Sequence, residues 1–142
     1  MELLHITTPE KSYDSLEEIT YHAEKVMQNL NLPYRTIALC SGDIGFTSTK
    51  TYDIEAWFPK RKTYIEVSSC SNTETFQSRR MNTKIKRTFS NIFEYPHILN
   101  GSGLAIGRIL LAIIENYSDE NNEIIIPDAL TKYMNGLKKI SF

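Results

Sequence analysis

The most informative segment of this chain is Asn100-Gly101-Ser102-Gly103-Leu104-Ala105-Ile106-Gly107-Arg108. It leads from an extended segment, through a glycine-rich turn, into a helix that we expect to run from Ser102 to about Tyr117. The segment is not a dinucleotide fingerprint, because Ile106 stands where the third glycine would fall. It is not a P-loop either, because the required Gly-Lys-Ser/Thr is missing.

Two interpretations of this segment stay open on its composition alone. Glycines let a ligand approach the main chain closely, and the start of a helix offers free N–H groups to an anion. In the first interpretation Arg108 stacks on an aromatic base or grips a phosphate. In the second, the segment is a tight packing turn between a strand and a helix, and Arg108 is an ordinary surface residue.

A second polar run comes earlier in the chain, Glu66-Val67-Ser68-Ser69-Cys70-Ser71-Asn72. A carboxylate and several hydroxyls at the end of a strand can hold a hard cation such as magnesium. Glu66 and Ser68 share one strand face if the alternation is regular, and Ser69 joins them if the strand bends. The alternative is a hydroxyl-rich strand end with a half-exposed glutamate.

A third cluster is basic and falls where we expect a helix, from Thr73 to Ile85. The sequence has no acidic residue between Thr75 and Phe93, and the cations in this stretch are Arg79, Arg80, Lys84, Lys86 and Arg87. Such a patch can meet RNA phosphates and makes binding salt-dependent. A solvated helix face explains the same charges equally well. The three histidines lack metal-ligand spacing, so we assign them no role.

Periodicity elsewhere predicts helices that flank an antiparallel sheet, which is the α+β class. Apolar residues recur at three- and four-residue steps from Tyr13 to Leu30, and a helix there would end at Asn31 to Pro33. Extended segments are expected at 35–40, 52–58, 63–69, 92–99 and 123–127, and the one at 92–99 leads into the glycine-rich turn.

The composition fits one globular domain over residues 1–142, with 41% hydrophobic residues and a net charge of −1. This near-neutral balance gives no global attraction to nucleic acid, so we expect no DNA partner and only a local RNA contact. Cys40 and Cys70 lack zinc spacing and are expected to be reduced. We find no signal peptide and no apolar run long enough for a bilayer, so we expect a cytoplasmic protein without a membrane partner.

Taken together, the segments resemble the bacterial-type seryl-tRNA synthetases. Thr51-Tyr52-Asp53-Ile54-Glu55-Ala56-Trp57, the run from Glu66 to Asn72 and Phe76-Gln77-Ser78-Arg79-Arg80 look like consecutive signatures of that family. Leu99 to Arg108 is similar to its form of class II motif three, and Ile126-Pro127 and Tyr133-Met134-Asn135-Gly136 resemble its tail. The resemblance covers almost the whole chain. It implies the C-terminal portion of a class II catalytic domain, from the end of motif two through motif three.

The resemblance also implies residue roles. Arg108 would be the motif three arginine that packs on the adenine of ATP, and with Glu66 it would carry the catalytic role. The ATP site would be lined by Glu66, Val67, Ser68, Ser69 and Arg108. Glu66 and Ser69 would contact Mg²⁺ through ATP. The serine substrate would be bound by Asn100, Ser102 and Glu2, and Glu2, expected just after the motif two strand, would take its amino group.

The implied activity is ATP-dependent activation of L-serine to seryl-adenylate, followed by transfer to tRNA(Ser), in an enzyme that is a homodimer at full length. Such catalysis needs positioning and charge stabilisation but no protein nucleophile. The chain departs from the family in lacking the coiled-coil tRNA-binding arm, motif one and nearly all of motif two. Ile65 and Ile98 stand where arginine and threonine are common. We therefore expect the isolated chain to be inactive. The alternatives are a non-catalytic relative that binds nucleotide, amino acid or protein, and an RNA-binding module.

Overall fold

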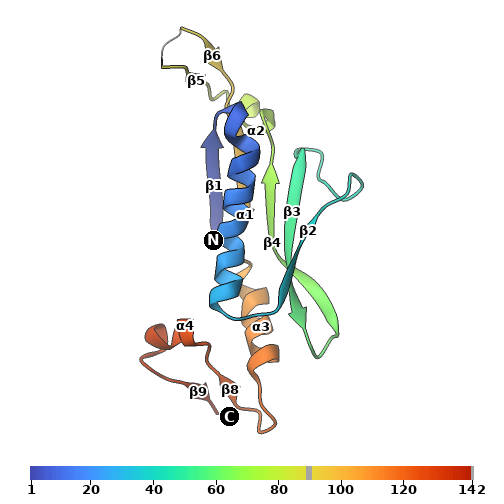
Figure 1. The fold of residues 1–142 in the computed structure, drawn as a ribbon, viewed down its shortest axis with the longest axis vertical. Coiled ribbons are helices and arrows are strands. Elements are labelled where there is room, and N and C mark those ends of the chain that lie inside the picture. The colour runs from blue at the N-terminus through green and yellow to red at the C-terminus, as the bar shows by residue number, and fades with distance from the viewer. Residues whose placement is uncertain (89–90, 142) are drawn as a thin grey trace.

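The computed structural model describes residues 1–88 and 91–141 and is built on a five-stranded antiparallel sheet (Figure 1). The strand order is β1-β7-β4-β3-β2, so strands from the two ends of the chain lie next to each other. The strands are β1 Glu2–Thr7, β2 Tyr34–Ala38, β3 Lys50–Phe58, β4 Thr63–Asn72 and β7 His97–Ser102. The α+β expectation of an antiparallel sheet flanked by helices is confirmed.

Two long helices cover one face of this sheet. Helix α1 (Ser12–Asn29) packs over β1, β4 and β7, and α3 (Ile106–Tyr117) packs over β3. The smaller elements are η1 Pro9–Lys11, α2 Phe76–Arg80, β5 Ile85–Lys86, β6 Phe93–Glu94, β8 Ile124–Ile125, α4 Asp128–Thr131, η2 Lys132–Met134 and β9 Lys139–Ile140. No helix among the described residues is both long and apolar enough to cross a membrane.

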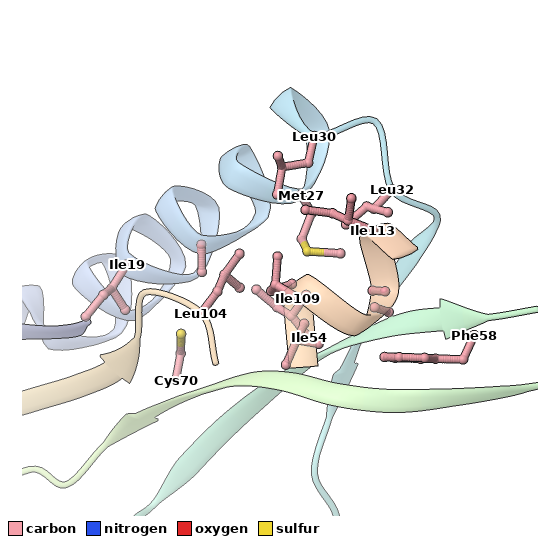
Figure 2. Close-up of a cluster of buried hydrophobic side chains, with 14 of the residues drawn as sticks. Ile19, Met27, Leu30, Leu32, Ile54, Phe58, Cys70, Leu104, Ile109 and Ile113 are labelled. Atoms are coloured by element: carbon pink, nitrogen blue, oxygen red, sulfur yellow. The ribbon is translucent and has the colours of Figure 1, made fainter. Parts of the chain in front are cut away.

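The core lies between the two helices and the sheet. Figure 2 shows Ile19 and Met27 of α1 pointing toward α3 and toward Ile54 and Cys70 of the sheet. Full burial of one such side chain stabilises the fold by about 1.5–3 kcal/mol. The predicted apolar stripe of α1 is therefore confirmed as its core face. The helix ends where the sequence predicted, because Asn31 adopts a left-handed conformation with φ of 50°.

The predicted helix from Thr73 to Ile85 is wrong in its length. Helix α2 has only five residues, Phe76–Arg80. Asn82 then takes φ of 51°, and the N–H of Thr83 donates back to the carbonyl of Ser78 at 2.9 Å, which closes the helix. The chain continues into β5, which pairs with β6 as a small hairpin.

Two strand boundaries also differ from the prediction. No local pattern predicted β1, and the expected helix at Ser102 begins only at Ile106. Both differences have one cause. Ser102 is still part of β7, where it pairs with Glu2 of β1. The pairing of two segments so far apart in the chain decides where the helix can start.

Gly101 lies where β7 crosses closest to β4, and its replacement should be costly. A Cβ built there would lie 2.6 Å from Cys70 Sγ and 3.3 Å from Cys70 Cα. Because the second contact is with main chain, Gly101→Ala should lower the free energy of unfolding by about 1–3 kcal/mol. Gly107→Ala is the matched control, since a Cβ at this helical position meets nothing within 4 Å. It should be neutral or stabilise by about 0.5–1 kcal/mol. Urea unfolding followed by circular dichroism distinguishes the two, and equal midpoints would contradict the proposed clash.

Candidate active site

The sheet face turned away from α1 and α3 carries a row of polar side chains. Directly opposed residues of an antiparallel pair point to the same face, so the register defines which side chains belong together. Ser102 lies opposite Glu2, Ser71 opposite Asn100, and Ser69 opposite Asp53. These side chains are half-buried or exposed, whereas the other face is buried in the core. We call this set, together with Glu55 and Glu66, the polar face.

A bulge in β4 decides which residues of the hydroxyl-rich run reach the polar face. Ile54 pairs with Ser68 but Glu55 pairs with Glu66, so Val67 is the extra residue. The bulge places Glu66 and Ser69 on the same face and turns Ser68 to the other. The expectation that Glu66 and Ser68 share a strand face is therefore wrong. The expectation that a bend in the strand brings Ser69 to the face of Glu66 is confirmed.

Ser68 and Val67 serve the fold with their side chains. Ser68 is 1% exposed, and its hydroxyl donates to the main-chain oxygen of Ser102 at 2.5 Å. The Val67 side chain is fully buried, and its carbonyl accepts a hydrogen bond from the N–H of Ala105 at 2.8 Å. Neither side chain can line a nucleotide site on the polar face. Instead both residues connect the middle of β4 to the glycine-rich turn.

The three residues expected to bind an amino acid lie together. Ser102 Oγ donates to Glu2 Oε2 at 3.3 Å, although the two residues are 100 positions apart. Asn100 lies two residues before Ser102 on the same face, and its Nδ2 donates to Gln77 Oε1 at 3.0 Å. Glu2 is the first residue of β1. The group offers a carboxylate, a hydroxyl and an amide at one end of the sheet.

Arg108 connects the glycine-rich turn to the hydroxyl-rich strand. Beyond Ser102 the chain leaves the ladder, and Leu104 adopts φ of 94°, so the left-handed residue of this turn is not a glycine. Helix α3 then starts beside the bulge in β4. Arg108 Nη1 donates to the Glu66 carbonyl at 2.6 Å and lies 3.6 Å from Glu66 Oε1. Both side chains are about half exposed, 52% and 47%, so the pair is accessible to a ligand.

The family of this chain follows from comparison with known proteins. Residues 1–117 match the family model described as tRNA synthetase class II core domain (G, H, P, S and T). The chain belongs to this family. The synthetase class II core domain therefore accounts for the whole five-stranded sheet, for α1 and for α3.

Relatives of this class II core are similar along almost the entire chain. The serine--tRNA ligase of Legionella pneumophila (strain Corby) is 56% identical over 141 residues, which are 99% of this chain and 33% of the relative. That of Francisella tularensis subsp. holarctica (strain LVS) is 56% identical over 140 residues, again 99% and 33%. The chain thus spans about a third of the length of the curated relatives it matches. The resemblance to seryl-tRNA synthetases is confirmed.

Solved structures agree with this assignment. The seryl-tRNA synthetase from Pyrococcus horikoshii complexed with ATP superimposes with a TM-score of 0.94 at 38% identity, over 99% of this chain and 31% of that one. The cytoplasmic serine-tRNA ligase from Naegleria fowleri in complex with AMP gives 0.91 at 34% identity, over 99% and 34%. Both relatives hold an adenine nucleotide, and the expected class II architecture is confirmed.

The donor set of the class II core fits magnesium only as an ion shared with phosphates. In residues 1–88 and 91–141 no three His, Cys, Asp or Glu side chains are grouped for a metal. Glu66 and Ser69 supply hard oxygen atoms on the same face, beside a carboxylate oxygen of Asp53 that is buried and accepts no hydrogen bond among the described residues. Mg²⁺ is usually held by one or two carboxylates, with waters and substrate phosphates completing its shell. The residues present fit such an ion.

Reasoning from the sequence missed Asp53 of the polar face and Gln77 of α2, which contacts that face. Asp53 lies opposite Ser69, and Gln77 holds the amide of Asn100. A signal for Asp53 was present in β3, where Thr51, Asp53 and Glu55 alternate with apolar residues. Such alternation predicts a sheet with one polar face. No local signal identifies Gln77, because α2 meets β7 only through the tertiary fold.

Proposed function

We propose that this chain is the C-terminal portion of the catalytic domain of a serine--tRNA ligase. The observation that carries the proposal is the polar face, which holds Glu2, Asn100 and Ser102 and also Glu66, the contact of Arg108 from α3. The proposed partners are L-serine, ATP and tRNA(Ser). The proposal includes Mg²⁺ bound through ATP, a homodimer of the whole enzyme and a cytoplasmic location.

Serine would bind to the part of the polar face that β1 and β7 form. The Glu2 carboxylate accepts hydrogen bonds from the substrate ammonium, while Ser102 and Asn100 bind its hydroxyl. The 3.3 Å contact between Ser102 and Glu2 places these groups at the spacing of the functional groups of one small amino acid. A site built to hydrogen-bond a hydroxyl rejects the analogue lacking it, by about 10⁴ to 10⁵ in the best cases.

ATP would be held at the part of the polar face that carries Glu66. The Arg108 guanidinium is planar and permanently charged, so it can stack on adenine and also meet phosphate oxygens. Its exposed contact with Glu66 contributes little to stability and is readily exchanged for a ligand. Glu66 and Ser69 would hold Mg²⁺, which supplies charge neutralisation of the phosphates when bound.

The reaction would proceed by positioning. The serine carboxylate attacks the α-phosphorus of ATP and forms a P–O bond, while the bond to pyrophosphate breaks and the leaving group takes the electron pair. The terminal ribose hydroxyl of the tRNA then takes the acyl group and AMP leaves. No protein nucleophile is required. Cys70 is unsuited to that role in any case, because burial raises the pKa of its thiol.

A chimaera tests the proposal. The chain replaces the matching C-terminal third of the Legionella pneumophila serine--tRNA ligase, to which it is 56% identical. We expect serine-dependent exchange of pyrophosphate into ATP and charging of tRNA(Ser). A folded chimaera that carries out neither reaction would contradict the proposed function and favour a non-catalytic relative.

Ser102→Ala in the chimaera should raise KM for serine about tenfold or more, because the unpaired substrate hydroxyl costs about 1–3 kcal/mol. KM for ATP should stay unchanged, since ATP binds at the part of the face that carries Glu66. Pyrophosphate exchange gives both constants. Ser71→Ala is the control on the same face, where the hydroxyl is paired with Thr51 at 2.8 Å. An equal rise in both constants for Ser102→Ala would show that Ser102 is not a serine contact.

A further inference from the structure

The segment from Phe76 to Lys86, which comprises α2 and the first strand of the small hairpin, carries four exposed cations. These are Arg79, Arg80, Lys84 and Lys86. Within the described part of the chain, none of the four makes an ion pair with a carboxylate. Their charge is therefore available to a partner outside the chain.

The neighbouring Arg87, in contrast, has a structural role because it forms two ion pairs. It binds Glu10 of η1 at 2.5 Å and Glu94 of β6 at 2.6 Å. The hydrogen bond from Arg87 lowers the pKa of the Glu10 carboxyl to about 2. Arg87 thus fixes the hairpin to the body of the protein. The four cations before it have no such function.

Aromatic rings lie next to three of these four cations. The guanidinium of Arg80 lies 4.2 Å from the centroid of the Phe76 ring, which meets the Phe46 ring edge-on at 5.7 Å. Arg79 and Lys84 lie over the Tyr95 ring at 4.8 Å and 5.3 Å. Phe46 is 88% exposed, so its ring is accessible from solvent.

This combination is chemically selective. Rings that are accessible from solvent can stack on unpaired bases, while the cations beside them neutralise the sugar–phosphate backbone. A duplex hides its bases from such rings, so the surface fits single-stranded RNA and not a double helix. A lipid surface or an acidic peptide would meet the cations without using the rings in this way.

The same segment is attached directly to the proposed serine site. Gln77 is adjacent to Phe76, and its Oε1 accepts the hydrogen bond from Asn100 Nδ2. The hairpin extends beyond the end of the sheet at which α2 lies (Figure 1). An RNA that binds this segment would therefore lie next to the proposed serine site.

We infer that Arg79, Arg80 and Lys84, with the rings of Phe76 and Tyr95, form a binding site for the single-stranded 3′ end of the acceptor RNA. The inference rests on the proposed function and adds to it the surface that guides the RNA. In this role the segment acts on the transfer step and not on the activation of serine. The two half-reactions can be measured separately, which makes the inference testable.

The principal test is the triple variant R79A/R80A/K84A in the chimaera. The control is K25A/K60A/K138A, which removes the same charge from exposed positions outside the polar face. With tRNA(Ser), the first variant should bind more weakly. Its slope of log affinity against log salt should be smaller by about 2, since each contact with single-stranded RNA contributes about 0.7. Pyrophosphate exchange, which needs no RNA, should be unchanged in both variants.

A second variant tests the rings. Y95L keeps the cations and removes the polar aromatic surface, so it should weaken RNA binding about tenfold without changing the salt slope. The losses in both variants should disappear with a tRNA(Ser) that lacks its single-stranded 3′ end. Single-turnover transfer of serine from the adenylate should fall in parallel with binding of the intact RNA.

Several results would overturn the inference. They are unchanged RNA binding in R79A/R80A/K84A, a loss as large in the control, a loss that persists with the truncated RNA, or a parallel loss of pyrophosphate exchange. Binding to phosphatidylserine vesicles that depends on the three cations, with no effect on RNA, would assign the patch to a membrane. Failure of the proposed function is distinct, because the unsubstituted chimaera would then show no exchange, and the RNA-binding measurements would still decide the role of the patch.

Discussion

Arg108→Ala is expected to reduce serine-dependent pyrophosphate exchange by the chimaera by about 10² to 10³, the usual cost of losing one preorganised contact to developing charge. One side chain at the start of α3 provides both a planar surface for the base and a permanent charge for the phosphates. Its partner Glu66 offers only a carbonyl at 2.6 Å and a carboxylate oxygen at 3.6 Å, so the fold gains little from the arginine. The loss should therefore appear in activity and not in stability.

Two further variants make this prediction specific. Arg108→Lys keeps the charge but lacks the planar fork and the stacking surface, so it should restore little activity. Arg61→Ala is the matched control, because Arg61 is also an exposed arginine with a glutamate partner, Glu115 at 3.5 Å, at the far end of the β3–β4 hairpin. It should leave exchange unchanged. Substantial activity in Arg108→Lys would count against the proposed role.

Local patterns predicted those parts of the fold that depend on neighbours in sequence. The stripe that includes Leu16 and Ile19 predicted α1, and the alternation in β3 and β4 predicted a hairpin. What failed depends on contacts between distant segments. No local pattern indicates that β1 pairs with β7, or that α2 ends after five residues because Asn82 takes a left-handed conformation. Side-chain propensity at such positions is weak compared with the tertiary context.

The bulge at Val67 is the clearest limit of sequence reasoning about the site. A shift of one residue in register moves every following side chain to the other face, and nothing in the run of serines specifies the shift. Composition alone therefore could not tell whether Ser68 or Ser69 accompanies Glu66. The resemblance to the synthetases supplied Glu2 as a partner of the serine site, whereas its contact with Ser102 emerged only when the sheet was assembled.

Residues 1–142 as a separate polypeptide are expected not to make seryl-adenylate. The chain covers 33% of the length of its relatives, and the proposed site on it consists of one row of side chains along a sheet. If several charge-stabilising contacts come from the rest of the enzyme, each contributes about 10² to 10³, so the combined loss exceeds about 10⁴. Exchange should be undetectable beside the active chimaera.

The surface of the chain supports this expectation. β1 is an edge strand, and its apolar residues Leu4 and Ile6 are 63% and 47% exposed. An apolar cavity of about 270 Å³ opens between α1, α3 and α4 and includes Leu110 in its lining. Exposed edges and apolar surface of this kind promote association. We therefore expect residues 1–142 to associate at micromolar concentration, as measured by sedimentation velocity.

The decisive measurement compares residues 1–142 with the chimaera in the same exchange assay. Circular dichroism on both proteins shows whether an inactive fragment is folded. Addition of the remaining two thirds of the Legionella pneumophila enzyme, expressed separately, tests whether the missing contacts can be supplied in trans. Recovery of exchange on mixing would support the proposal directly. Exchange by the fragment alone within about tenfold of the chimaera would falsify it, since a loss of that size is smaller than the cost of a single preorganised contact. It would mean that the polar face already carries a complete site.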